Sequence, residues 1–341
     1  MISIFIICFL VAFVISVVLT PLVRKFALMF RILDVPYTDI KTHKTPTPYL
    51  GGIAIASAFW VSIVVIRLFT SFPTGTLRSL RGILLGSFVM LLLGIFDDIK
   101  HKGLHFKFKF LVQAIAAILL LSYGIRIKFI QPEWFAIVMT VIWVIGITNA
   151  FNIIDIMDGL SGGIALVCAL GFFLIGIPAE EEIYVNFVSI ALVGACLGFL
   201  PYNLGNKLKI FMGDTGALFI GFILASVSLG VKYTEVNTLG LFAPLLILAI
   251  PMYDTLLVIY FRWKKGKSPF LGSKDHFALR LEKIGYSRKK IIVVCYIVSL
   301  FLSFCALLIT RVDILIAGVI YLLLLVLAFI ITYELAKIKV E

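Results

Sequence analysis

Long apolar runs, each separated from the next by a short polar stretch, repeat along the whole chain. A hydrocarbon core about 30 Å thick is crossed by a helix of about 20 apolar residues. The runs therefore predict eleven membrane spans, at about 1–20, 50–69, 79–96, 109–124, 134–149, 160–177, 184–201, 215–231, 239–261, 290–310 and 313–333. The first run lacks a basic leader and a small-residue cleavage site, so we interpret it as a span and not as a cleavable signal.

Eleven spans sort the connecting segments onto two faces. One face receives the C-terminal tail and the segments at about 21–49, 97–108, 150–159, 202–214 and 262–289. Most Lys and Arg residues lie in or beside these segments, and the exceptions are Arg67, Arg78, Arg81, Arg126, Lys128, Lys232 and Arg311. The positive-inside rule then makes this face cytoplasmic and leaves the N-terminus outside. We expect an all-α polytopic membrane protein, one membrane-embedded domain over 1–341, with its active site on the cytoplasmic loops.

Composition excludes several other classes of protein. Apolar residues make up 62% of the 341 residues and charged residues only 14%, and mean hydropathy is +1.14. A soluble enzyme, a disordered chain and a disulfide scaffold all have other compositions. The net charge of +12 follows from the basic loops, so nucleic acid is not expected as a partner. The five cysteines all lie inside apolar runs and are most simply core residues.

The residues able to do chemistry gather on the expected cytoplasmic face. This holds for every histidine and for the aspartates at span ends: His43, His101, His105, His276, Asp97, Asp98, Asp155, Asp158 and Asp214. A transporter tends to carry its ionisable groups near the membrane midplane, on broken helices. The placement favours chemistry at the membrane surface over passage through the membrane or a purely structural role.

Asp97 and Asp98 form the first candidate cluster, in L-G-I-F-D-D-I-K at the end of the third span. Carboxylates here can ligate a divalent cation, orient a lysine or act as a base. Solvation of a helix end is the alternative. Acidic residues at a helix C-terminus oppose the helix dipole, which mildly supports a functional reason.

The second cluster is N-A-F-N-I-I-D-I-M-D-G-L-S-G-G at 149–163. Asn149, Asn152, Asp155 and Asp158 follow one another at spacings of three, which on a helix makes a polar stripe. Such a stripe suits Mg²⁺ and a nucleotide, and the following glycines permit close backbone approach to a ligand. Capping of the next helix is the alternative reading of the asparagines.

The third cluster surrounds Asp214, which stands between two glycines in F-M-G-D-T-G, eleven residues after Asn203. Asp214 is also a natural helix N-cap. Oxygen ligands without His or Cys favour Mg²⁺ or Mn²⁺ over Zn²⁺.

Two further segments are suited to phosphate. K-T-H-K-T-P-T-P-Y-L-G-G at 41–52 places basic groups before a helix start, where backbone N–H groups attract anions. In S-K-D-H-F-A-L-R, His276 and Arg280 stand four apart and share a helical face. A rigid loop and a lipid-headgroup anchor are the respective alternatives. Asp254, inside the ninth span, is expected to have a buried partner or a role.

Taken in order, these segments resemble the polyprenyl-phosphate N-acetylhexosamine-1-phosphate transferases. That superfamily includes the initiators of enterobacterial common antigen, O-antigen and teichoic-acid linkage, and phospho-MurNAc-pentapeptide translocase. The matching stretches are P-T-P-x-x-G-G, F-D-D, N-x-x-N-x-x-D-x-x-D-G, F-M-G-D-T-G and D-H-x-x-x-R, and they span about Lys41 to Ser287.

The resemblance implies a bacterial plasma-membrane enzyme that uses Mg²⁺ or Mn²⁺, a UDP-N-acetylhexosamine and polyprenyl phosphate, with a homodimer left open. Asp214 and Asp155 would hold the metal, and Asp97, Asp98 and Asp155 would be catalytic. The remaining residues would bind substrate: Lys41, Thr47, Asn149, Asn152, Asp158, Asn203, His276 and Arg280.

The chain departs from the resemblance at two places. Ile156 stands where a glycine is common, and His276 is followed by Phe277, Ala278 and Leu279 in place of further histidines. The triple-histidine signature of the MurNAc-pentapeptide enzyme is therefore missing, which favours a small donor such as UDP-GlcNAc. The peptidoglycan enzyme is the alternative within the class, and a membrane transporter is the alternative outside it.

Overall fold

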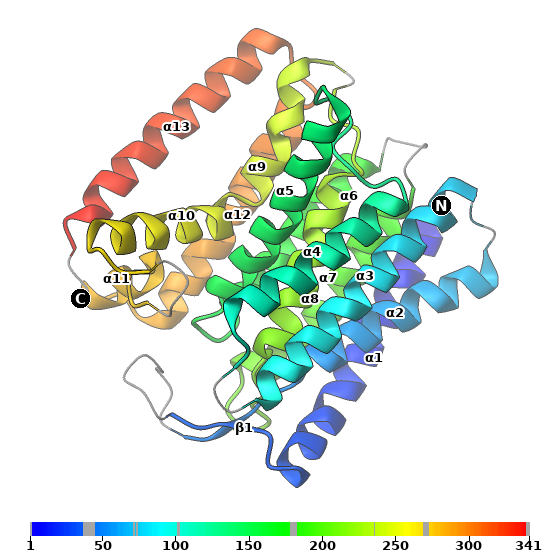
Figure 1. Cartoon of the computed structure of the whole chain (residues 1–341), viewed down its shortest axis with the longest axis vertical. Coiled ribbons are helices and arrows are strands. Elements are labelled where there is room, and N and C mark those ends of the chain that lie inside the picture. The colour runs from blue at the N-terminus through cyan, green and yellow to red at the C-terminus, as the bar shows by residue number, and fades with distance from the viewer. Residues whose placement is uncertain are drawn as a thin grey trace.

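A computed structural model describes residues 2–36, 45–70, 72, 74–100, 103–177, 183–234, 236–268 and 273–338. The described part is helical apart from one two-stranded ribbon (Figure 1). The first half contains α1 (Ile2–Met29), β1 (Leu33–Asp34), β2 (Thr47–Pro48), α2 (Gly51–Phe69), α3 (Thr74–Ile99), α4 (Phe106–Ser122), α5 (Glu133–Ile153) and α6 (Leu160–Gly176). The second half contains α7 (Tyr184–Leu204), α8 (Gly213–Ser228), η1 (Thr238–Phe242), α9 (Ala243–Ile247), α10 (Ala249–Lys264), α11 (Phe277–Lys283), α12 (Arg288–Ile309) and α13 (Ile314–Ala336).

The all-α membrane fold is confirmed, while the number of spans stays a prediction. A helix, or a broken pair of helices, lies at each of the eleven expected positions. Within the described residues, seven helices are long and apolar enough to cross a membrane, or eight if one bent pair is counted as a span. Two shorter apolar helices, α6 and α8, lie among them.

Helix α8 lies at the centre of the bundle. It packs against α3, α5, α2 and α6, and nearly all of its residues are buried. Small residues allow this close packing: a Cβ on Gly52 of α2 would fall 2.1 Å from the backbone nitrogen of Gly216. In lipid, such close helix packing replaces the hydrophobic drive that water supplies to soluble proteins. The polar start of α8 is thereby held firmly between its neighbours.

The ninth expected span is broken, not continuous. The segment η1–α9 and α10 meet at an angle of 71°. Pro251 lacks the backbone N–H that would bond to the carbonyl of Ile247, which interrupts the helical ladder. The thiol of Cys168 donates to that same carbonyl at 3.0 Å. One of the cysteines interpreted as core filler thus satisfies a backbone group at the break.

The two ends of the bundle differ in chemistry. One end carries the β1–β2 ribbon, the end of α3, the beginnings of α4 and α8, and the turn between α5 and α6. The expected site residues collect at this polar end.

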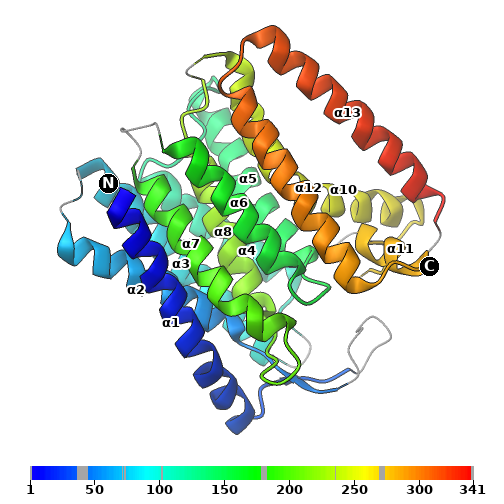
Figure 2. The same ribbon diagram turned by 180° about the vertical axis from the view of Figure 1, so that it is seen from behind.

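Helix α13 lies apart from the bundle in both views (Figures 1 and 2), and only 6% of its most apolar window is buried.

Candidate active site

Three separate parts of the chain bring five carboxylates to the polar end of the bundle. Asp97 and Asp98 lie in the last turn of α3, and Asp214 lies in the first turn of α8. Asp155 and Asp158 lie in the turn between α5 and α6. Since α3 and α5 both pack against α8, the end of each meets the beginning of α8. The three sequence clusters therefore form a single site.

Lys109, in the first turn of α4, lies between two of these carboxylates. Its Nζ atom is 3.1 Å from Oδ2 of Asp97 and 2.5 Å from Oδ2 of Asp214. All three side chains are less than one third exposed. Sequence reasoning missed this residue because it counted Lys109 among the basic loop residues. The sequence signal was a lysine one turn into an apolar helix, which snorkelling also explains; only its burial in the structure excludes that explanation.

Asp98 caps the beginning of α8. Its Oδ1 accepts a hydrogen bond from the Asp214 backbone N–H at 2.9 Å. Its Oδ2 accepts from the backbone N–H and the hydroxyl of Thr215, at 3.1 and 2.6 Å. Gly213 has φ of +70°, and a Cβ there would fall 2.3 Å from Oδ2 of Asp98. The carboxylate that ends α3 thus satisfies the unpaired donors of another helix.

The asparagine stripe has two different environments. Asn152 lies beside the Asp214 side chain, which places it in the site. Asn149 donates to the side chain of Gln113 at 2.7 Å and to the carbonyl of Ile145 at 2.7 Å. Asn149 therefore joins α5 to α4, and its expected contact with substrate stays a prediction.

Asp155 has neighbours of the same charge and no described hydrogen-bond donor. Burial raises the pKa of its carboxyl well above the usual value, and Asp214, Asp158 and Asp98 raise it further. Carboxylates that repel one another in a partly buried site favour a cation or a proton among them. Asp155 is therefore a suitable ligand for a cation that arrives with a phosphate substrate.

Asp158 and Asn203 organise the loop that borders the site. Lys209 Nζ is 2.5 Å from Oδ2 of Asp158. Asn203 accepts from the backbone N–H of Gly159 at 2.5 Å and donates to the carbonyl of Ile210 at 3.0 Å. Asn203 thus joins the turn after α5 to the loop before α8. We expected the glycines at 159–163 to admit a ligand.

Gly159 and Gly163 each have a structural reason to be glycine, and close approach of a ligand to this segment stays a prediction. Gly159 has φ of +79°, a conformation that L side chains rarely adopt, and a Cβ on Gly163 would fall 1.9 Å from the hydroxyl of Tyr296 in α12. That hydroxyl donates to the carbonyl of Gly159 at 2.6 Å. Apart from Arg31 and Leu50, the positive-φ residues of the described part are glycines. Ile156, at the position where a glycine is common, therefore causes no backbone strain.

At the start of α2, backbone N–H groups that we expected to attract an anion are bonded to the protein itself. The backbone N–H groups of Gly51 and Gly52 donate to the carbonyls of Phe211 and Met212, at 2.9 and 3.0 Å. Those two donors are used inside the protein, and phosphate binding by the rest of this segment stays a prediction. Thr47 is buried in β2, and its hydroxyl donates to the carbonyl of Thr45 at 3.0 Å. Lys41 lies outside the described residues.

His276 is the buried partner that we expected Asp254 to have. Nδ1 of His276 is 2.7 Å from Oδ2 of Asp254, and the backbone N–H of Phe277 donates to Oδ1 at 3.0 Å. Asp254 is fully buried and His276 is 5% exposed. The pair joins the beginning of α11 to α10 and fixes the orientation of the imidazole.

Arg280 points to a different set of partners. Its guanidinium is 2.8 Å from Asp275, donates to the carbonyls of Leu335 and Ile338, and lies 3.8 Å from the centre of the Phe261 ring. The side chain is 2% exposed. It attaches the end of α13 to α11, so the expected common face with His276 does not extend to their functional groups. Phosphate binding by Arg280 stays a prediction.

Comparison with known proteins identifies the family. The model of glycosyl transferase family 4 matches residues 80–232, the stretch that contains the five carboxylates. A probable undecaprenyl-phosphate N-acetylglucosaminyl 1-phosphate transferase of Bacillus subtilis is 31% identical over 88% of this chain and 84% of its own length. The chain belongs to glycosyl transferase family 4. It is therefore a phosphotransferase and a multi-pass membrane protein.

Two other relatives mark the breadth of this family. The decaprenyl-phosphate N-acetylglucosaminephosphotransferase of Mycobacterium tuberculosis is 30% identical over 75% of this chain and 70% of its own length. The phospho-N-acetylmuramoyl-pentapeptide-transferase of Listeria innocua is 30% identical over 84% and 91%. Family-4 enzymes of this kind transfer a sugar 1-phosphate to a polyprenyl phosphate, and they are generally Mg²⁺-dependent.

The carboxylate cluster is suited to a Mg²⁺ ion that is bound jointly by the protein and the substrate phosphates. Within the described residues, no group of three or more His, Cys, Asp or Glu side chains forms a metal cage. Mg²⁺ usually binds one or two carboxylates together with water and substrate phosphates, so a full cage is not required. The metal ligands available in the cluster are carboxylate oxygens, and Asp214, Asp158 and Asp98 all lie close enough to Asp155 to raise the pKa of its carboxyl. This donor set matches the preference of Mg²⁺.

Proposed function

We propose that this family-4 enzyme transfers N-acetylglucosamine 1-phosphate from UDP-GlcNAc to undecaprenyl or another polyprenyl phosphate. The products are polyprenyl-diphospho-GlcNAc and UMP, which makes this the first membrane step of a cell-envelope glycan. The observation that supports it best is the single cluster of Asp97, Asp155, Asp214 and Lys109 at one end of an apolar bundle. A site at the membrane surface that contains both negative carboxylates and a positive lysine suits phosphoryl transfer between a soluble nucleotide and a lipid.

The reaction follows from positioning and charge neutralisation. An oxygen of the lipid phosphate forms a bond to the β-phosphorus of the UDP-sugar, and the bond from that phosphorus to the bridging oxygen breaks, so that UMP leaves. The sugar C1–O bond is untouched. A phosphate monoester is mostly a dianion at pH 7, since its second pKa is about 6. No strong base is needed, and we favour one-step displacement over an aspartyl-phosphate; trapping of a phospho-aspartate would contradict this.

Each charged residue has a distinct proposed role. Asp155 and Asp214 would hold Mg²⁺, which neutralises charge on the diphosphate. Lys109 would supply a fixed positive charge beside them, and Asp97 would orient Lys109. Asp98 would act indirectly, because its carboxylate is occupied in holding Asp214 and Thr215.

The nucleotide would lie on the other side of the cluster. Asp158 with Lys209 presents paired charges there, and Asn203 fixes the two loops on which they stand. Asn152 beside Asp214 would contact the same substrate. His276, held by Asp254, would present its second ring nitrogen to a phosphate.

The donor and the membrane orientation are further parts of the proposal. The missing second and third histidines after His276 favour UDP-GlcNAc over UDP-MurNAc-pentapeptide. The GlcNAc named in the Bacillus subtilis relative supports the same choice. The bias of Lys and Arg to the loops beside the cluster supports a cytoplasmic active site in a bacterial plasma membrane.

The test measures Mg²⁺-dependent UMP release in membranes containing polyprenyl phosphate. We expect Asp97→Asn, Asp155→Asn and Asp214→Asn each to lower turnover by at least 100-fold, since each removes a charge that the transition state needs. Glu334→Gln, at an exposed ion pair with Lys337, is the matched control and should retain turnover. Near-normal rates in all three aspartate variants would refute the site.

A donor panel separates the two candidate substrates. We expect UDP-GlcNAc to support turnover and UDP-MurNAc-pentapeptide to be at least 100-fold poorer. The Listeria relative is the reason for including the second donor. Preference for the peptidoglycan precursor would move the chain to that branch of the family.

A further inference from the structure

A pair of side-chain amides joins α4 to α5 close to the carboxylate cluster. Nδ2 of Asn149 donates to the side-chain oxygen of Gln113 at 2.7 Å, and Nε2 of Gln113 donates back to Oδ1 of Asn149 at 3.3 Å. Gln113 is 1% exposed, and it is the one polar residue in the stretch 110–121. A buried amide in an apolar membrane helix is costly unless it bonds a neighbouring helix. The two amides satisfy each other.

Each member of the pair stands one helical turn from a residue of the cluster. Lys109 and Gln113 are four positions apart on α4, and Asn149 and Asn152 are three apart on α5, so each two share a helix face. Nζ of Lys109 is 2.5 Å from Oδ2 of Asp214, and Asn152 lies beside the same side chain. Helices α4 and α5 therefore meet twice, once at Asp214 and once through the amide pair.

The amide pair uses most of the hydrogen-bonding capacity of Asn149. Its two N–H groups donate to Gln113 and to the carbonyl of Ile145, both at 2.7 Å. Its oxygen accepts from Gln113. A substrate that accepts a hydrogen bond from Asn149 would have to displace one of these partners. The geometry suits a residue that holds two helices together better than a residue that contacts the nucleotide.

We propose that Gln113 and Asn149 are positioning residues for the transfer reaction. Their two opposed hydrogen bonds fix α4 against α5, and thereby place Lys109 and Asn152 around Asp214. This inference rests on the proposed function, because it assigns the pair a role in the same site. Displacement of a reacting or binding group by about 1 Å can cost about 100-fold in rate. Loss of the pair should therefore lower kcat and leave binding of the UDP-sugar nearly unchanged.

A double-mutant cycle on turnover tests the pairing. The variants are Gln113→Leu, Asn149→Leu and the double variant, assayed as UMP release from UDP-GlcNAc with undecaprenyl phosphate. We expect each single variant to lower kcat by at least about tenfold and to change KM for UDP-GlcNAc by less than threefold. The double variant should lose no more than the worse single variant, because the second substitution removes a bond that is already broken.

Thermal unfolding of the same proteins separates positioning from general destabilisation. Each single variant leaves one buried amide without its partner and should lower the melting temperature. The double variant replaces both amides by apolar groups and should recover part of the loss. Turnover should not recover with it, because two leucines do not fix the position of α4 against α5.

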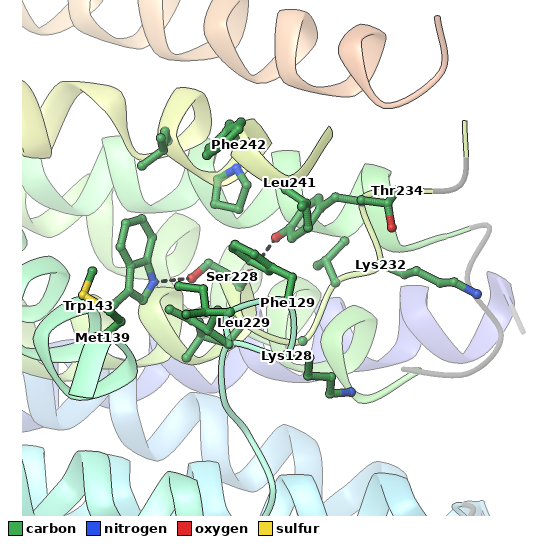
Figure 3. A pocket seen from close by; sticks show the side chains of 17 residues that line it. Lys128, Phe129, Met139, Trp143, Ser228, Leu229, Lys232, Thr234, Leu241 and Phe242 are labelled. Atoms are coloured by element: carbon green, nitrogen blue, oxygen red, sulfur yellow. Dashed lines mark hydrogen bonds between the residues drawn. The ribbon is translucent and has the colours of Figure 1, made fainter. Parts of the chain in front are cut away.

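Ser228→Ala is the matched control. Nε1 of Trp143 in α5 donates to Oγ of Ser228 in α8 at 2.8 Å, in the wall of a cavity of about 610 Å³ (Figure 3). Asp214 and Ser228 stand fourteen positions apart on α8, which is about 21 Å along the helix axis. This variant also removes a hydrogen bond between α5 and its neighbour, far from the cluster, and should keep kcat within about threefold of wild type.

Amide hydrogen exchange in substrate-free protein tests the positioning without the reaction. We expect faster exchange at 106–112, the beginning of α4, in Gln113→Leu and also in Asn149→Leu, whose substitution lies on the other helix. Ser228→Ala should exchange there like wild type. This comparison does not depend on the donor. A wild-type protein that releases no UMP would contradict the proposed function, while the exchange result would still decide this inference.

Four results would overturn the inference. Losses in kcat that multiply in the double variant would show that the two amides act independently. A rise in KM for UDP-GlcNAc in Asn149→Leu alone would make Asn149 a substrate contact. Recovery of turnover together with the melting temperature in the double variant would show a purely structural pair. Unchanged exchange at 106–112 would show that the pair does not hold α4.

Discussion

Substitution of Asp98 by asparagine separates a positioning role from a catalytic one. The carboxylate accepts three hydrogen bonds at the beginning of α8, two of them from Thr215. An amide has a single acceptor oxygen, so Asp98→Asn loses at least one of these charge-assisted bonds and turns an N–H group toward a donor. It also removes a negative charge from a helix N-terminus.

The expected loss of stability can be worked from these contacts. A hydrogen bond to a charged group contributes about 1.5–3 kcal/mol, and a favourable charge at a partly buried helix terminus adds up to about 2 kcal/mol. We expect Asp98→Asn to lower the free energy of unfolding by about 3 kcal/mol. Turnover should fall as well, because the backbone of Asp214 is no longer held in place.

The assay is thermal unfolding of detergent-solubilised protein without substrate, followed by UMP release at a temperature where the variant is folded. Thr215→Val removes only the hydroxyl bond to the carboxylate and should cost about 1.5–2 kcal/mol, at the lower end of that range. Thr215→Ser keeps the bond and serves as the control. Stability equal to wild type together with lost turnover in Asp98→Asn would refute the positioning role. Asp98 would then be a catalytic group.

Two further variants test the ion pairs of the structure. Lys109→Met leaves Asp97 and Asp214 facing each other without their cation. Removal of one partner from a buried ion pair costs about 3–5 kcal/mol, so we expect a lower melting temperature, which added Mg²⁺ should partly restore. Lys109→Arg should have a melting temperature closer to that of the wild type. An unchanged melting temperature would contradict the contacts at 3.1 and 2.5 Å. Arg280→Gln should release the end of α13, which would be measured as faster amide hydrogen exchange at residues 335–338. Arg288→Gln, which breaks a surface ion pair, is the control and should change the free energy of unfolding by less than about 1 kcal/mol. A large rise in KM for the UDP-sugar without faster exchange would instead support phosphate binding by Arg280.

Helix positions could be predicted from the sequence because the bilayer imposes a simple rule. A chain in lipid must satisfy its backbone hydrogen bonds internally, so each apolar run of sufficient length forms a helix. The break in the ninth span was not predicted, although Pro251 was visible. A proline in a membrane helix can be accommodated in several ways, and the packing of Cys168 against Ile247 is what the local sequence does not show.

The location of the site could be predicted better than the roles of its residues. Asp97, Asp155 and Asp214 were expected together, and the structure places all three at one end of the bundle. Lys109 and the capping role of Asp98 were not expected, because their partners stand 105 and 116 or 117 positions away. Such contacts depend on the register between α3, α4 and α8.

By itself, the sequence determined an all-α membrane protein, a polar end rich in carboxylates and the family to which the chain belongs. These properties follow from local composition and from motifs of a few residues. Only the tertiary structure decided which carboxylate meets Lys109, which one caps α8 and where Arg280 points. The physical reason is that hydrogen bonds and ion pairs act over about 3 Å, whereas a sequence motif leaves the packing of helices around α8 undetermined.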